Sequence, residues 1–215
     1  MTKRTVTAFA FIACVAAGVG ANSLTAQSGI PGSVAVERVQ AGTYALDPSH
    51  TQVSWQVSHF GFNDYFGLFG DIEGTMTLDP AQVEDAAFDI TVPITSVAVS
   101  SAGLRDHLLR GGTDGGAPDF FGPDPEPARF VSTSVRQTSS TTAVVSGQLT
   151  MNGNSGPVTM LVTFTGAGQN PMNQKDTVGF HARARIDRTQ WGIEYAAPAI
   201  GADVDLTISA AFERQ

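Results

Sequence analysis

Cysteine is almost absent from this chain. Cys14 is the single cysteine among 215 residues, so a fold held by disulfides within the chain is excluded. Cys14 also lies within residues 1–21, which have the features of a secretory signal. If that segment is removed, the mature chain has no cysteine, which is compatible with an oxidising compartment.

Charge is also scarce, and positive charge most of all. Only 15% of residues are charged, and 12 Lys and Arg stand against 20 Asp and Glu, for a net charge of −8. Loss of Lys3 and Arg4 with the signal would change the net charge from −8 to −10. Binding to nucleic acid depends on Lys and Arg contacts to phosphate, so we expect no nucleic-acid partner. Electrostatic adhesion to anionic lipid is disfavoured for the same reason.

The patterns of metal and catalytic centres are missing as well. The four histidines include no closely spaced ligand pair. His50 and His59 are nine residues apart on one predicted strand. With a rise of about 3.3 Å per residue, they would lie too far apart to share a metal ion. There is no G-x-S-x-G nucleophile elbow beside Asp106 and His107. We therefore expect neither a metal site nor an enzyme.

The same residues are expected to have structural roles. Asp106 and His107 are predicted to hold a short helix over the fold through hydrogen bonds. His50 and His59 are predicted to form hydrogen bonds near strand ends.

The N-terminus is predicted to carry an export signal. Lys3 and Arg4 precede the mostly apolar stretch Val6–Val19, and Val19-Gly20-Ala21 provides a small-residue cleavage site, with cleavage as late as residue 26 as an alternative. The stretch is shorter than the roughly 20 residues of a spanning helix, so no stable membrane span is expected. We predict a periplasmic or secreted protein. Lipid anchoring through Cys14 is the alternative, because Phe11–Cys14 resembles a lipoprotein cleavage box. Residues 22–40 are predicted to be a flexible lead-in.

Strand patterns dominate the chain from residue 41 onward. The chain contains 23 glycines and 11 prolines, and eight segments are predicted to be strands, with apolar and polar residues alternating most clearly in residues 53–59, 75–78, 88–94 and 204–212. The eight segments are residues 53–59, 75–78, 88–94, 130–136, 142–151, 158–165, 178–186 and 204–212. A short helix is expected within residues 97–110, ending at Gly111-Gly112 and followed by a loop to residue 127. The pattern predicts one all-β antiparallel domain, either a sandwich or a barrel.

One segment is unusually aromatic. Residues 60–69, FGFNDYFGLF, place five aromatic residues within ten positions. Exposing them to water would be unfavourable by about 25 cal/mol per Å² of apolar surface. Two interpretations remain open: ordinary core packing, or the wall or mouth of a ligand tunnel.

An ordered series of blocks resembles one family. The blocks are YALDPSHTQVSWQVSH (44–59), LRDHL (104–108), DFF (119–121), FVST (130–133), GQLTMNG (147–153) with PVT (157–159), VGF (178–180) and IDRTQWG (186–192). Together they are similar to the YceI-like family of bacterial secreted lipid-binding proteins, over residues 41–215. The chain departs from the family's pattern at Gly112–Pro118, at Glu126 and at Asn154–Gly156. All three departures are expected to fall in loops, so they leave the tunnel mouth and the ligand's identity open.

The resemblance implies a single lipocalin-like barrel of about eight strands with a short helix. Its apolar tunnel would hold a long-chain ligand, namely a polyisoprenoid, an isoprenoid quinone or a fatty-acyl lipid. The protein would sequester or carry this ligand and need no cofactor. The alternative is an envelope or stress structural protein with a filled core. A homodimer is left open. The predicted tunnel-wall residues are Trp55, Val57, Phe62, Phe66, Phe69, Met76, Leu104, Leu108, Phe121, Met151, Met160, Val162, Phe164, Phe180 and Trp191.

Two further residues are expected to have structural roles. Arg188 is predicted to stack on Trp191 or to pair with a carboxylate such as Asp47, joining the first and last parts of the barrel. Trp191 itself has two interpretations, as a core aromatic residue or as part of the tunnel wall.

Overall fold

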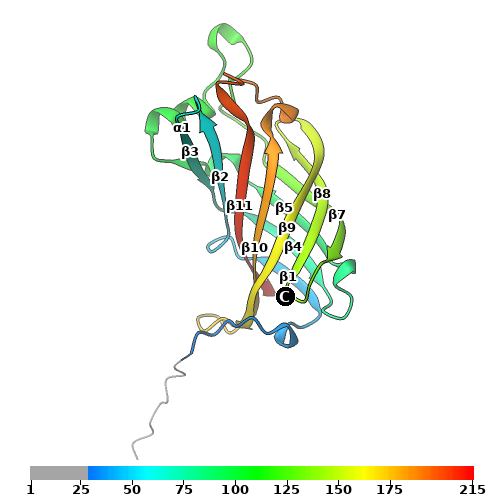
Figure 1. Cartoon of the computed structure of the whole chain (residues 1–215). Coiled ribbons are helices and arrows are strands. Elements are labelled where there is room, and N and C mark those ends of the chain that lie inside the picture. Colours follow the sequence, from blue (N-terminus) through cyan, green and yellow to red (C-terminus); the bar gives the residue numbers. More distant parts are fainter. Residues whose placement is uncertain (1–28) are drawn as a thin grey trace, which may run out of the picture.

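The strands form a closed antiparallel barrel (Figure 1). A computed structural model describes residues 29–215. The prediction of a single antiparallel barrel of eight strands is confirmed, and the sandwich is excluded. The eight strands follow one another around the barrel, with β11 returning to β1, in the order β1 (Gly42–Leu46), β4 (Glu73–Leu78), β5 (Ala87–Val92), β7 (Ala128–Gln137), β8 (Thr142–Met151), β9 (Asn154–Gln169), β10 (Asp176–Asp187) and β11 (Ile200–Arg214).

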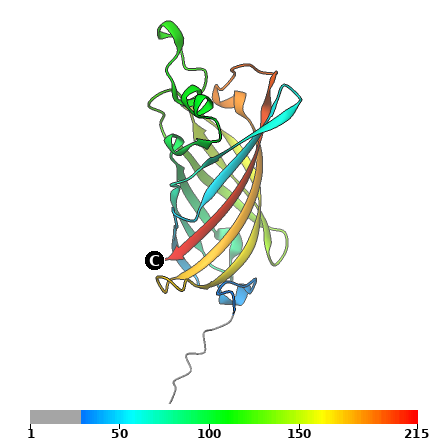
Figure 2. The ribbon, with the colours of Figure 1, turned by 90° about the vertical axis from the view of Figure 1, so that its left-hand side faces the viewer.

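Strand β11 closes the barrel because one of its edges has two partners. Its last part pairs with β1, for example Phe212 with Leu46, and its first part pairs with β2 (Gln52–His59). Strand β2 pairs in turn with β3 (Asn63–Phe69), and β3 with the short β6 (Ala98–Val99). The β2–β3 hairpin therefore extends the wall at one end of the barrel, where it projects from the body (Figure 2).

Two hairpin turns contain two successive residues with left-handed backbones. Asn152 and Gly153 join β8 to β9 with φ of 52° and 75°, as their sequence predicts. Phe60, Gly61 and Phe62 join β2 to β3. Phe60 and Gly61 have φ of 54° and 70°, and the Phe62 amide donates to the carbonyl of His59 at 3.1 Å. Both are the turn geometry that matches the twist of paired strands.

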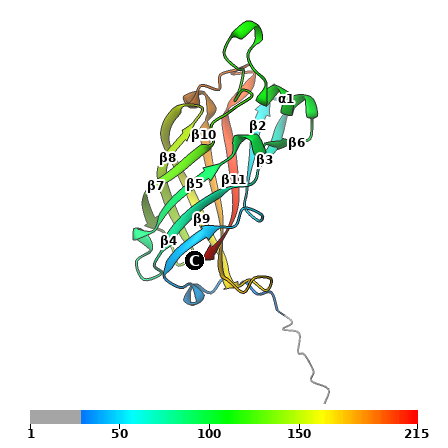
Figure 3. The same cartoon turned by 180° about the vertical axis from the view of Figure 1, so that it is seen from behind.

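One α-helix, α1 (Ala102–Leu109), lies beside the β2–β3 hairpin (Figure 3). The Ser101 hydroxyl accepts from the Leu104 amide at 3.2 Å and caps the helix. The helix ends before Gly111-Gly112, as expected. Short 3₁₀ turns occupy Val36–Arg38, Val83–Asp85, Ile94–Ser96, Thr113–Gly115 and Arg188–Trp191. We call this end of the barrel, with α1, the β2–β3 turn and residues 192–199, the α1 end, and the opposite one the C-terminal end.

Side chains fill the C-terminal end. A cluster that includes Tyr44, Met76, Phe164 and Phe212 is buried there, and the Tyr44 hydroxyl donates to the carbonyl of Gln40. Residues 29–40 of the predicted lead-in contact this end, where Ser33 exchanges backbone hydrogen bonds with Ala167. The predicted signal segment and Cys14 lie outside the described residues. Within residues 29–215, every helix is too short or too polar to cross a bilayer.

Candidate ligand-binding cavity

A cavity of about 550 Å³ runs inside the barrel. This volume lies within the range of about 300–1,000 Å³ that is typical of small-molecule sites. Almost all of its lining side chains are apolar, and inward-facing residues of β2 and β11 such as Trp55, Val57, Leu206 and Ile208 form one wall. On β10 the inward positions Ala182 and Ala184 are small, which leaves space open.

The cavity is sealed at one end and reaches the surface at the other. Leu46, Ile72 and Phe212 line it at the C-terminal end, and all three are buried. Phe60 and Tyr195 line it at the α1 end, where they are 54% and 43% exposed. A ligand would therefore enter at the α1 end.

Polar lining groups come from the elements of the α1 end. They are His59, Tyr65, His107, Arg188 and Tyr195. The ring of His59 lies edge-on to Tyr65, with 5.4 Å between centroids. The His107 ring lies 4.9 Å from Tyr195. This is the arrangement of a binding pocket in which a few polar groups stand at one end of an apolar chamber.

His107 links α1 to the loop that follows it. Its Nε2 lies 2.7 Å from Asp119 Oδ2, and Arg110 Nη2 lies 3.3 Å from the same oxygen. These hydrogen bonds, from His107 first and then from Arg110, lower the pKa of Asp119. The Phe121 amide also donates to the Leu108 carbonyl at 3.1 Å. The loop is thereby held on the helix, with Phe120 and Phe121 on the cavity wall.

Arg188 organises the segment that follows it in the chain. Its guanidinium donates to the carbonyls of Ile193, Tyr195, Ile200 and Gly201 at 2.6–3.0 Å. Burial lowers its pKa, opposed by the nearby Asp187. The predicted pairing with Asp47 is wrong, because Asp47 Oδ2 lies 2.6 Å from His50 Nδ1 instead. The side chain of Arg188 fixes residues 193–201 rather than joining the two halves of the barrel.

Ten predicted wall residues line the cavity. They lie on β2, β3, α1, the loop after it and β8–β10, and they are Trp55, Val57, Phe69, Leu104, Leu108, Phe121, Met151, Met160, Val162 and Phe180. Whether they contact a ligand stays a prediction.

Five others lie elsewhere, which corrects their assignment. Phe62 and Phe66 are 89% and 61% exposed, because Phe62 lies in the β2–β3 turn and Phe66 on the outward face of β3. Met76 and Phe164 point inward but pack in the filled C-terminal end, below the cavity.

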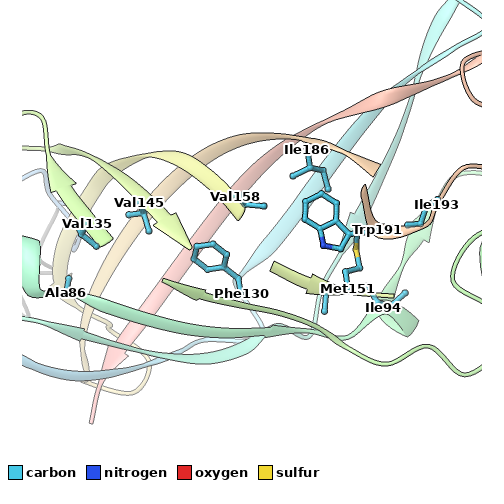
Figure 4. Close-up of a cluster of buried hydrophobic side chains, with 11 residues drawn as sticks. Ala86, Ile94, Phe130, Val135, Val145, Met151, Val158, Ile186, Trp191 and Ile193 are labelled. Atoms are coloured by element: carbon cyan, nitrogen blue, oxygen red, sulfur yellow. The ribbon is translucent and has the colours of Figure 1, made fainter. Parts of the chain in front are cut away.

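Trp191, the fifth, lies outside the cavity lining and belongs to a buried cluster with Met151 and Ile186 (Figure 4). Its indole Nε1 donates to the Leu149 carbonyl at 3.0 Å. The interpretation of Trp191 as a core residue therefore holds, and stacking by Arg188 is replaced by the hydrogen bonds described above.

The predicted polar residues separate in space. His50 is exposed beside Asp47, whereas His59 is on the cavity wall. Asp106 is exposed on α1, and Asp119 rather than Asp106 carries the hydrogen bond to His107. In residues 29–215, no three His, Cys, Asp or Glu side chains gather as a metal site would require.

Several lining residues escaped the sequence prediction. Phe60, Tyr65 and Tyr195 belong to this group, as do Phe120 and the small Ala184. Tyr65 was detectable in principle, because Tyr65, Gly67 and Phe69 alternate along β3. Phe66 and Leu68 on the opposite face concealed that alternation. For Tyr195, in a segment without strand periodicity, no local signal exists.

A closed antiparallel barrel around an apolar chamber that opens at one end defines a lipocalin-like fold. The sequence profile of the YceI-like domain matches residues 44–212, and the chain belongs to this family.

Relatives and solved structures agree with this assignment. A UPF0312 protein of Pseudomonas fluorescens strain SBW25 is 32% identical over 175 residues, which cover 80% of this chain and 86% of that protein. Burkholderia cenocepacia BcnA is similar in fold, with a TM-score of 0.62 and 19% identity over 77% of this chain and 98% of that one. A domain of Saccharophagus degradans described as polyisoprenoid-binding has a TM-score of 0.52 and 12% identity, covering 80% and 98%. At these identities, the two structures support the fold alone.

Proposed function

We propose that this protein is an exported carrier or sequestering protein for a long-chain apolar ligand of the polyisoprenoid, isoprenoid quinone or fatty-acyl type. The observation that carries the proposal is the apolar cavity, sealed at the C-terminal end and open at the α1 end. Burial contributes about 0.8 kcal/mol per CH₂ group, so a long chain can bind tightly without any chemical step. One structural neighbour with this fold is described as polyisoprenoid-binding, and the apolar cavity is suited to a ligand of the same class.

The ligand's head would lie at the α1 end. His59, Tyr65, His107 and Tyr195 present imidazole and phenol groups there, while the nearby charges of Arg110 and Asp119 are paired with each other. The tail would extend towards Phe212 and Phe180. The alternative of a filled core disagrees with a cavity of about 550 Å³.

Native mass spectrometry tests the proposal. The mature protein, purified without detergent from its own periplasm or medium, is expected to carry a stoichiometric long-chain lipid, which organic extraction identifies. The intact mass also shows whether residues 1–21 are removed, as export requires, or whether Cys14 is lipidated. An empty protein that takes up neither isoprenoids nor quinones would contradict the proposal.

A pair of variants separates cavity binding from adsorption to the outer surface. Ala184 faces the cavity and the neighbouring Arg183 is exposed on the outside of β10. We expect Ala184→Trp to abolish uptake, because the indole fills the chamber, and Arg183→Trp to bind as the wild type does. Circular dichroism checks that both variants fold. Equal uptake by two folded variants would show that the ligand does not enter the barrel.

A further inference from the structure

The β2–β3 hairpin exposes more apolar surface than its fold requires. Phe62 is 89% exposed, Phe66 61%, Phe60 54% and Leu68 40%. We call these four residues the hairpin patch. Because apolar surface in water is unfavourable by about 25 cal/mol per Å², a concentration of this kind marks a surface that contacts something else.

The hairpin patch is continuous with the opening of the cavity. Phe60 belongs to both, since it is exposed and also lines the chamber. Phe62 follows at the tip of a hairpin that projects at the α1 end (Figure 2). Phe66 and Leu68 continue along the outward face of β3, opposite the inward Tyr65 and Phe69. Anything that covers the patch therefore faces the entrance.

The backbone helps to present these rings. Phe60 has a φ of 54°, a left-handed conformation that is unfavourable for a bulky side chain. The tight turn keeps Phe60 at the entrance and directs Phe62 away from the barrel.

The charge of the hairpin restricts the choice of partner. Residues 52–70 contain no Lys or Arg, and their one carboxylate, Asp64, accepts from Gln56 Nε2 at 2.6 Å. In α1, Arg105 donates to the carbonyls of Thr95 and Val97. Such a surface lacks the cations that bind anionic headgroups. Aromatic side chains without charge are instead suited to the boundary between headgroups and acyl chains.

We propose that the hairpin patch docks on the surface of a lipid bilayer of zwitterionic or neutral lipid and sets the open end of the cavity against it. An apolar ligand would then pass between bilayer and chamber without crossing water, a step that rests on the proposed function. The docking itself depends only on the exposed side chains. A second copy of the chain suits the patch less well, because a stable protein interface involves about 20–30 residues a side and the patch has four.

Flotation with phosphatidylcholine vesicles tests the docking. The protein as purified is expected to float with the vesicles. The partition coefficient of the double variant Phe62→Ser/Phe66→Ser onto the vesicles is expected to fall by about tenfold or more. Met172→Ser is the matched control, because Met172 is 90% exposed but lies in the turn after β9, at the C-terminal end. Leu161→Ser, at a position 53% exposed on the outer wall, is a second control. Both controls are expected to float as the wild type does.

Ligand uptake is measured separately, by adding an isoprenoid from ethanol in the absence of vesicles. Unchanged uptake by the double variant, together with its loss of flotation, supports the proposal. If the wild type takes up no isoprenoid but floats through the patch, the proposed function fails and the docking stands.

The docking is overturned if the wild type does not float, if the double variant floats equally well, or if flotation requires anionic lipid. Loss of a dimer in the double variant, with no flotation by the wild type, would assign the patch to a second copy instead.

Discussion

At the scale of single residues, Gly67 decides where Trp55 lies. The two positions are paired across β2 and β3, and a Cβ at position 67 would lie 2.2 Å from Cζ2 of Trp55. The indole therefore occupies the space of a side chain that glycine lacks. Its Nε1 is buried without a hydrogen-bond partner among the described residues, so the ring is held by packing alone.

Gly67→Ala is expected to push the indole of Trp55 from its place. Overpacking of this kind destabilises a protein by about 1–3 kcal/mol, and displacement towards the chamber would weaken ligand binding. Urea unfolding and isoprenoid titration measure the two effects. Gly70→Ala is the control, since a Cβ there meets no atom within 4 Å. Unchanged stability and binding in Gly67→Ala would contradict this role.

Residue positions could be predicted where one face of a strand is polar. Val53, Trp55, Val57 and His59 alternate with polar residues, and all four line the cavity as a set. Phe62 and Phe66 could not be placed in this way, because hydrophobicity is a guide to burial and these two are exposed. Met76 and Phe164 point inward, but the sequence does not show at which depth the barrel becomes filled.

At the scale of elements, α1 and the loop after it are joined by Asp119. Because the hydrogen bonds from His107 and Arg110 lower the pKa of Asp119, the folded state favours its ionised form. This stabilisation is complete above the usual carboxyl pKa of about 3.9 and is lost as the pH falls through the lowered value. The attachment of the loop is therefore stable at neutral pH and sensitive to strong acid.

Asp119→Asn is expected to loosen this attachment at neutral pH. Limited proteolysis should cut residues 111–127 faster in this variant, and bound ligand should dissociate faster, because the loop carries Phe120 and Phe121 of the cavity wall. Asp124→Asn, an exposed carboxylate in the same loop, is the control. The same cleavage rate in both variants would mean that Asp119 does not hold the loop.

Most elements could be predicted from local patterns, and the exceptions have a physical cause. The eight expected segments correspond to β2, β4, β5 and β7–β11. Strand β3 was missed because Phe66 and Leu68 make both of its faces apolar. The place of β1 could not be predicted because its partners β4 and β11 are distant in sequence, and local alternation carries no information about pairing.

At the scale of the whole molecule, an unfilled apolar chamber lowers stability, because its lining atoms lack neighbours on one side. A ligand that binds only the folded protein stabilises it by about 2.7 kcal/mol at a concentration of 100 times Kd. We therefore expect the lipid-free protein to unfold at lower denaturant concentration than the loaded one. The Ala184→Trp variant should show no such shift. Equal midpoints for free and saturated wild type would exclude binding inside the folded barrel.

The pairing of β11 with both β1 and β2 also determines at which stage of folding the chamber forms. Strand β1 lies near the start of the described chain and β11 at its end, and only their contact completes the ring. A chain still being synthesised or translocated has no β11 in place, and so no enclosed space. Contacts between such distant segments form late in folding. The chamber can therefore take up a ligand only after β11 has paired with β1, in whichever compartment the chain completes its folding.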